Sequence, residues 1–212
     1  MNKVQQLIVL AGLAIFLTSI SLFTLDNNAF ALEFSNYTSL KDGIMFEYPS
    51  DWKLVEKTSR FDSGPDLMIA DYSSNRNINI IFPDSFPSSA GELLDTYGLE
   101  RLVELLLNGI TDDFGSEYKT IEEPSTISID GKETGTFLFT SQDKYDDFAI
   151  KYAKQFWLSY ANDKLYQFTY ISPTTTFDNL ENVEIRDHFI NSIKFLGDSE
   201  IEVEPQQKSR FD

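Results

Sequence analysis

Alternating apolar and polar positions dominate the chain after residue 32 and predict a protein built largely of half-buried β-strands. The alternation runs through 44–48, 67–72, 78–82, 127–129, 137–139, 148–160 and 166–170. Asp130-Gly131 predicts a two-residue hairpin turn, and Asn162-Asp163 reverses the chain again. We expect the long aromatic hairpin that contains this second turn to occupy the centre of the sheet.

Two further segments have the spacing of helices. The first begins with Ser89-x-x-Glu92, a pattern that caps the free amides of a helix start, and runs to about Asn108-Gly109, a predicted stop or kink. Its residues at helical spacing include Leu93, Leu94, Tyr97, Leu102, Leu105 and Leu106. The second runs from about 178 to 192, with Ile185, Phe189 and Ile193 at positions i, i+4 and i+8 on one expected apolar face, and Lys194-Phe195 is expected to end it. Strands joined by tight turns, with only two helices, predict an α+β fold in which an antiparallel β-sheet packs between or against helices.

The first 31 residues are typical of a secretory signal peptide. Lys3 precedes the apolar run 7–25, and Ala29-Phe30-Ala31 has the small-residue pattern at which signal peptides are cleaved. The apolar run is also close to the roughly 20 residues that span a bilayer, so an uncleaved membrane anchor is the alternative. Both interpretations place the folded domain, 32–197, outside the cytoplasmic membrane. The remaining residues, 198–212, are acidic and have little to bury, so we expect a disordered tail.

Composition narrows the classes of function. The 212 residues include 34 acidic and 17 basic side chains, one histidine and no cysteine, for a net charge of −17. The lack of cysteine excludes disulfides, thiolate zinc sites and cysteine nucleophiles, and a single histidine excludes a multi-histidine metal site. Such a negative chain repels phosphate, so nucleic acid is not an expected partner. The negative charge has three interpretations. It can provide solubility outside the cell, it can be an adaptation to high salt, or it can serve to dock the protein on a cationic surface or to concentrate divalent cations.

Few residues suggest chemistry directly. His188 is expected on the last helix as a structural or surface residue, because no nucleophile motif accompanies it. The densest acidic loop carries Asp143, Asp146 and Asp147, whose carboxylates are candidate Ca²⁺ ligands although their spacing is not that of an EF-hand. A hydrolase that uses two carboxylates is a second alternative. Asn36-Tyr37-Thr38 is an N-glycosylation sequon, relevant only if the export route glycosylates.

Three segments together resemble the PsbP-like domain family. Residues 43–52 resemble the opening hairpin of these domains, with its glycine, its aromatic-proline pair and its tryptophan. Residues 163–168 are similar to a later hairpin, and residues 188–195 to a closing helix that ends in a Ser-hydrophobic-x-Phe pattern. The residues that carry the resemblance are Tyr48, Pro49, Trp52, Tyr166, Ser192 and Phe195.

This resemblance implies a fold and a general role, but no reaction. PsbP itself is the extrinsic lumenal subunit of the oxygen-evolving photosystem, with an antiparallel sheet sandwiched by helices. The resemblance implies an exported, non-enzymatic accessory or binding domain, without implying photosynthesis. Its expected partner is a membrane protein complex or a small ligand, no cofactor is expected, and contact with the membrane itself is expected only through an uncleaved N-terminal segment. Histidine metal ligands suggested for some plant members cannot be carried over, because this chain has only His188.

Overall fold

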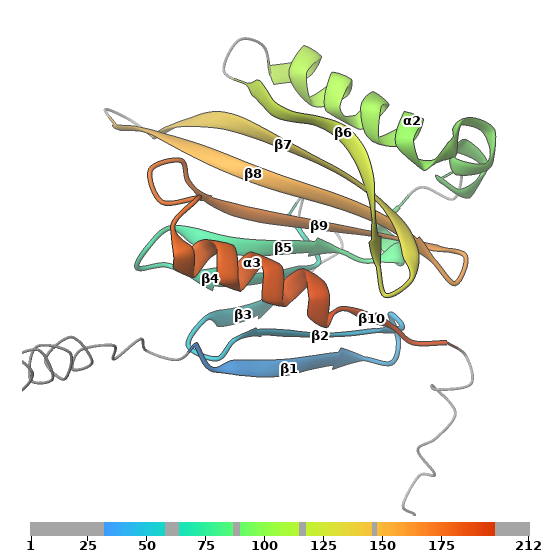
Figure 1. Ribbon diagram of the computed structural model, residues 1–212, viewed down its shortest axis with the longest axis horizontal. Coiled ribbons are helices and arrows are strands. Elements are labelled where there is room, and N and C mark those ends of the chain that lie inside the picture. Colours follow the sequence, from blue (N-terminus) through green and yellow to red (C-terminus); the bar gives the residue numbers. More distant parts are fainter. Residues whose placement is uncertain (1–31, 58–63, 87–89, 115–117, 146–147, 198–212) are drawn as a thin grey trace, which may run out of the picture. The chain divides into compact units, whose positions relative to one another are not determined.

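The computed structural model describes residues 32–57, 64–86, 90–114, 118–145 and 148–197, which form two antiparallel sheets and two α-helices (Figure 1). The smaller sheet has the order β1-β2-β10, with β1 (Phe34–Ser39), β2 (Ile44–Pro49) and β10 (Lys194–Phe195). The larger has the order β3-β4-β5-β9-β8-β7-β6, with β3 (Lys53–Glu56), β4 (Leu67–Asp71), β5 (Arg76–Ile81), β6 (Lys119–Ile129), β7 (Lys132–Tyr145), β8 (Phe148–Ala161) and β9 (Lys164–Pro173). The helices are α2 (Ala90–Phe114) and α3 (Leu180–Ser192), and a short 3-10 helix, η1 (Pro83–Ser85), follows β5.

Both predicted hairpin turns lie where the sequence placed them. Asp130 and Gly131 have φ angles of 49° and 72°, and Asn162 and Asp163 have φ angles of 51° and 58°. Two successive positive φ angles match the right-handed twist of the flanking strands, and Asn, Asp and Gly adopt them at least cost. The second turn joins β8 to β9, which lie at the centre of the larger sheet as expected. The predicted α+β class is confirmed.

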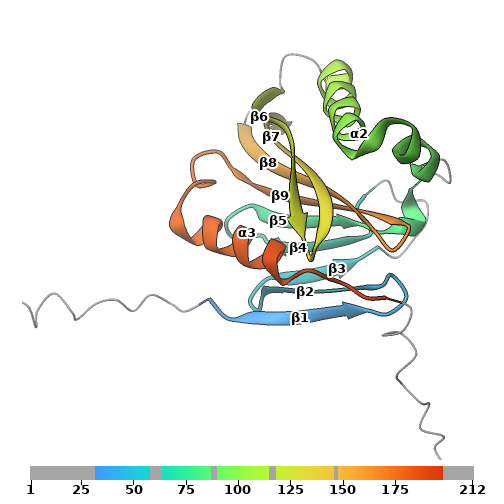
Figure 2. The same cartoon turned by 45° about the vertical axis from the view of Figure 1, so that its right-hand side comes forward.

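Helix α2 covers one face of the larger sheet, at the β6–β9 side (Figures 1 and 2). Successive strand residues point to opposite faces, so one set of alternating side chains on β7, β8 and β9 meets the helix. The buried cluster consists of Leu94, Leu99, Val103, Leu107, Phe137, Phe139, Phe156, Leu158 and Leu165. The closest approach is at Gly135, where a Cβ atom would lie 2.2 Å from Val103 Cγ2. Glycine is required here because no larger residue leaves room for the helix.

Helix α3 and the smaller sheet cover the opposite face. The predicted apolar positions Ile185, Phe189 and Ile193 are at most 1% exposed. The Phe189 ring makes edge contacts with Phe46 of β2 at 5.4 Å and with Phe168 of β9 at 6.0 Å between ring centroids. This helix therefore holds the two sheets together through aromatic packing.

The structure corrects the prediction for the first helix. Asn108-Gly109 neither stops nor kinks it, since α2 continues to Phe114, and the kink lies at Gly98 with φ 74° and ψ 164°. This backbone region is essentially restricted to glycine. The kink shifts the helical phase, so that Leu99 and Val103 carry on the buried stripe while Tyr97 is left outside.

The smaller sheet is the second departure from expectation, because the alternation pattern suggested one sheet. Lys194-Phe195 does not simply end the last helix but pairs with β2 as β10. Its neighbour Leu196 donates a backbone hydrogen bond to Gly43 O at 2.9 Å. A two-residue strand has no periodicity of its own, so its pairing is decided entirely by the tertiary structure.

Several predictions concern residues that the structure does not describe. The signal peptide or anchor, 1–31, the acidic tail, 198–212, and the capping residue Ser89 lie outside the described residues. Within the described part of the chain, no helix has the length and apolar character needed to cross a membrane.

Candidate functional site

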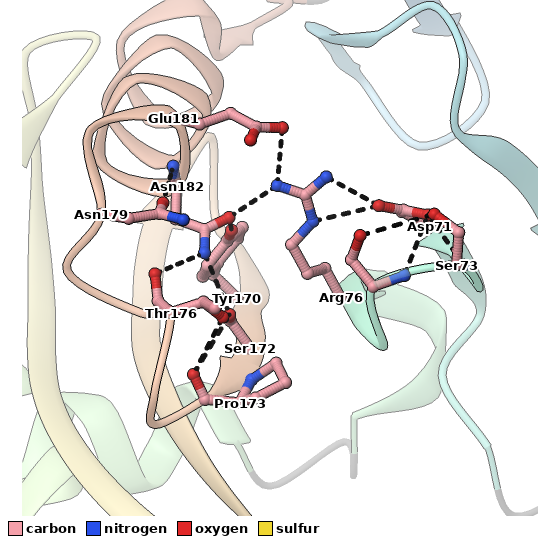
Figure 3. Close-up of polar contacts among 11 residues, drawn as sticks. Asp71, Ser73, Arg76, Tyr170, Ser172, Pro173, Thr176, Asn179, Glu181 and Asn182 are labelled. Atoms are coloured by element: carbon pink, nitrogen blue, oxygen red, sulfur yellow. Dashed lines mark hydrogen bonds and ion pairs between the residues drawn. The ribbon is translucent and has the colours of Figure 1, made fainter.

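The most extensive buried polar cluster surrounds Arg76, the first residue of β5 (Figure 3). Its side chain is 9% exposed. Nε and Nη2 both donate to Asp71 Oδ2, at 3.1 and 2.7 Å. Nη1 donates to Glu181 Oε1 at 2.8 Å and to Asn182 Oδ1 at 2.9 Å. The guanidinium carbon lies 5.3 Å from the centroid of the Trp52 ring, so the cation also rests against an aromatic face.

Asn182, in the first turn of α3, is fully buried and completes the cluster. Its Oδ1 atom also accepts from the Tyr170 hydroxyl at 2.8 Å. Its Nδ2 atom donates to Thr176 O at 2.7 Å and to Ser172 Oγ at 3.2 Å. Its backbone N donates to the Oδ1 atom of Asn179, which caps the helix. All hydrogen-bonding atoms of this buried amide therefore have partners.

The electrostatics of the cluster favour its charged state. Burial opposes ionisation of Asp71, but hydrogen bonds from Ser73, Arg76 and Ser74 outweigh it and hold the pKa of this carboxyl well below its usual range. Burial raises the pKa of the Tyr170 hydroxyl, which therefore stays a neutral donor. An ion pair with this many hydrogen bonds compensates much of its desolvation.

This arrangement is suited to fastening rather than to binding a substrate. Four N–H groups of Arg76 are directed at atoms of the protein, and Asp71 Oδ1 accepts from Ser73 Oγ at 2.5 Å and from two backbone amides. The cluster ties the β4–β5 hairpin to the first turn of α3. Sequence reasoning missed it, and the available signal was Arg76 itself, a charged residue opening an apolar strand.

A shallow groove of about 200 Å³ lies beside the cluster, lined in part by Met68, Ala70, Asn77, Tyr152 and Ile171. Asn77 lines the groove, and Asn79 lies two positions further along β5. The carboxamide oxygens of both residues are buried and have no hydrogen-bond partner among the described residues. Register places both side chains on the α2 side of the sheet, beyond the strands that α2 covers. This part of the face is polar and open on its outer side.

His188, on α3, contacts the smaller sheet. Its Nε2 atom is 2.6 Å from Glu47 Oε2, and its ring stacks on Phe34 at 3.6 Å between centroids. The side chains of His188 and Glu47 are 37% and 40% exposed. The expectation of a structural or surface histidine agrees with this placement, in which His188 connects α3 to β1 and β2.

The predicted calcium ligands are only partly within the described residues. Asp143 lies in β7, where its backbone is opposite Ile150 of β8, whereas Asp146 and Asp147 fall outside the described residues. In the part of the chain that the structure describes, no group of three or more acidic or histidine side chains could hold a metal ion. The sequon residue Asn36 is exposed on β1.

Several of the six residues that carry the family resemblance contact elements that are distant in the sequence. Tyr166 is fully buried, donates to Asp42 O at 2.8 Å, and contacts Phe195 at 5.0 Å between ring centroids. Burial and the nearby Asp42 carboxylate raise its pKa to about 12. Ser192 Oγ accepts from the backbone of Glu47 at 2.9 Å and donates to Phe189 O at 2.7 Å.

The opening motif, 43–52, includes the end of β2 and the turn that follows it. Tyr48 and Pro49 close this strand, and the turn that follows is held by a hydrogen bond from Trp52 N to Pro49 O at 3.0 Å. Trp52 is 5% exposed and stacks at 6.5 Å on Tyr170. Trp52, Tyr166, Ser192 and Phe195 thus connect β2, β9, β10 and α3.

Comparisons with known proteins agree with this architecture. The family model described as PsbP matches residues 32–192. The solution structure of cyanobacterial PsbP (CyanoP) from Synechocystis sp. PCC 6803 is similar, with a TM-score of 0.53 at 17% identity, over 80% of this chain and 96% of that chain. This likeness shows the shared fold.

Two further solved structures are more distant. LpqN of Mycobacterium tuberculosis, described as involved in cell envelope biogenesis, has a TM-score of 0.47 at 12% identity, over 79% of this chain and 92% of its own. A protein of Bacteroides thetaiotaomicron VPI-5482 has a TM-score of 0.46 at 14% identity, over 77% of this chain and 49% of its own. No curated protein matches the chain. The family match extends over most of the chain and includes every segment of the resemblance except the last few residues, so the protein belongs to the PsbP family.

Proposed function

We propose that this protein is an exported, non-enzymatic accessory domain that acts by binding at the outer face of the membrane. The observation that carries the proposal is the start of the family match at residue 32, directly after the segment whose apolar run and Ala-x-Ala pattern are typical of export signals. The proposed partner is a membrane protein complex or a small ligand.

The use of the buried polar groups supports a binding role over an enzymatic one. Arg76, Asp71 and Asn182 form hydrogen bonds with one another and with neighbouring side chains and backbone atoms of the described residues. His188 is engaged with Glu47 and Phe34. An acid–base or nucleophilic role requires a group directed at a substrate, whereas these groups are directed at the fold.

Export can be tested with the full chain expressed in its source organism. We expect the protein outside the cytoplasmic membrane, either with Leu32 at its mature N-terminus or still attached to the membrane. Mass spectrometry of the intact protein, together with protease accessibility in whole and broken cells, distinguishes these states. An Ala31→Arg variant should block cleavage without blocking export. Full-length protein retained in the cytoplasm would contradict the proposal.

The binding role can be tested by chemical cross-linking in intact cells, followed by purification of the tagged full chain. We expect a defined membrane protein complex to co-purify in a fixed ratio. A protein recovered without either a protein partner or a bound small molecule, or one that turns over a substrate, would overturn the proposed role.

A further inference from the structure

The outer surface of α2 exposes large apolar side chains although the helix is well packed beneath. Leu93, Tyr97 and Leu105 are 42%, 51% and 41% exposed. Leu93 and Tyr97 are four residues apart before the Gly98 kink, and Arg101 and Leu105 are four apart after it, so each pair lies on one helix face. Three large exposed apolar side chains on one helix make this surface a candidate for contact with another molecule.

A groove of about 480 Å³ lies at the kink, where Tyr97 of this surface reaches it. It is lined by Tyr97, Gly98, Leu99, Glu100, Arg101, Glu104 and Glu133, the last contributed by β7. The kink opens the groove, since nothing lies within 4 Å of the Cβ position of Gly98. We call the exposed residues Leu93, Tyr97 and Leu105, with Glu100, Glu104 and Glu133 of the groove, the α2 patch.

The charge of the α2 patch selects its partner. Arg101 Nη1 lies 2.5 Å from Glu104 Oε2, so the one cation lining the groove is already paired with a carboxylate of the same helix. Glu100 and Glu133 have no ion-pair partner among the described residues. The field of a chain with a net charge of −17 reinforces theirs.

The negative charge of the α2 patch argues against most other binding partners. A second copy of the chain would bring like charges together, and an anionic lipid surface or a nucleic acid would be repelled. The carboxylates are too spread for a single metal ion, since the described residues hold no group of three that could ligate one. A protein segment that carries both Lys or Arg and apolar side chains satisfies the apolar and the acidic parts together.

We propose that the α2 patch docks a basic, partly apolar segment of the partner protein. Tyr97 and the two leucines contact the apolar side chains of that segment, and Glu100 and Glu133 pair with its ammonium or guanidinium groups. The inference rests on the proposed accessory function and adds the surface and the chemistry of the partner to it.

The test uses the protein as exported by its host and a synthetic helical peptide of leucine and lysine, about 18 residues or roughly five turns long. Affinity is measured by calorimetry at about 0.15 M salt, where exposed long-range attraction is largely screened. The variant Leu93→Ser/Tyr97→Ser/Leu105→Ser keeps the net charge and should bind at least about tenfold more weakly, as expected when central apolar contacts are lost.

A matched control removes exposed apolar residues elsewhere. Leu40, Val55 and Tyr72 are 41%, 36% and 61% exposed and lie outside α2, so the triple serine variant at these positions should bind within about twofold of the original protein. Glu100→Gln/Glu133→Gln should weaken binding, while Glu56→Gln/Glu184→Gln, with the same charge change, should not. Thermal melts of all variants should show midpoints near that of the original protein.

Equal losses in patch and control variants, or no loss in either, would overturn the inference, because binding would then not depend on where the apolar or acidic side chains lie. The outcome is separable from that of the proposed function. A patch variant that is exported and still co-purifies with the same membrane complex overturns the docking surface and leaves the accessory role standing. Protein retained in the cytoplasm contradicts the accessory role, and the peptide affinities of the full chain purified from that compartment still test the docking surface.

Discussion

The two helices are attached to the larger sheet in different ways. Helix α3 combines an aromatic core around Phe189 with the saturated polar cluster of Arg76, Asp71 and Asn182. Helix α2 packs on the sheet through the apolar cluster around Val103, is kinked at Gly98, and leaves Tyr97 half exposed. Directional hydrogen bonds fix one geometry, whereas apolar contact is non-directional. The position of α3 is therefore fixed by directional contacts, whereas α2 keeps exposed apolar side chains on its outer face, which is the surface proposed to bind a partner.

The largest effect should come from breaking the polar cluster. Arg76→Met leaves the Asp71 carboxylate without its cation and removes one of the donors to Asn182, and we expect a loss of about 3–5 kcal/mol in the free energy of unfolding. Urea unfolding followed by tryptophan fluorescence measures this loss. The double variant Arg76→Met/Asp71→Asn, which removes the stranded charge, should recover part of it. A loss below about 1 kcal/mol would show that the cluster does not hold α3 in place.

Trp52→Ala should cost a similar amount, about 3–5 kcal/mol, because it empties a core position that contacts both Tyr170 and Arg76. Chemical denaturation followed by circular dichroism is the measurement. Trp52→Phe, which keeps an aromatic ring, is the matched control and should retain most of the stability. If the alanine variant unfolds within about 1 kcal/mol of the original protein, Trp52 is not a core residue and becomes a candidate binding residue.

On the α2 side the sensitive feature is close packing. Gly135→Ala places a methyl group 2.2 Å from Val103 Cγ2, which forces the helix or the strand to move. We expect a loss of about 1–3 kcal/mol from overpacking, measured by thermal and urea unfolding. Val103→Ala provides the missing space, so the double variant Gly135→Ala/Val103→Ala should lose less than the sum of the two single variants. Simple additivity would contradict this contact.

The smallest expected effect is a change in how the free energy of unfolding depends on pH in acid. The pKa of Asp71 is lowered in the folded protein, so the unfolded state binds more protons at low pH. Its contribution to stability is present above the unfolded pKa of about 3.9 and is lost as the pH falls below that value. The free energy of unfolding should therefore decline less steeply between about pH 5 and pH 2 in Asp71→Asn than in the original protein. Asp51→Asn, at an exposed neighbouring turn, is the control for net charge, and an identical acid slope in all three proteins would exclude this role of Asp71.

The sequence predicted those parts of the fold that depend on neighbouring residues. The turn residues Asp130-Gly131 and Asn162-Asp163 favour positive φ angles through their own chemistry, whatever surrounds them. The stripe Ile185-Phe189-Ile193 likewise specifies its buried face by spacing alone. These signals are local, so they survive without knowledge of the rest of the chain.

The candidate sites were less predictable, because they join residues far apart in sequence. Arg76 meets Asn182 across 106 positions, and Glu133 meets the Gly98 kink only when β7 packs against α2. Apolar periodicity placed Tyr97 on a helix without showing that the kink would leave it outside. Neither connection has a signature in a single sequence.

The sequence by itself determined the strand alternation, the hairpin turns, the buried stripe of α3 and the family, because each follows from residue chemistry over a few positions or from motifs in a fixed order. Only the tertiary structure decided the kink at Gly98, the pairing of β10 with β2 and the cluster around Arg76. These depend on which distant side chains fill the same space, and on where a buried charge finds its partners.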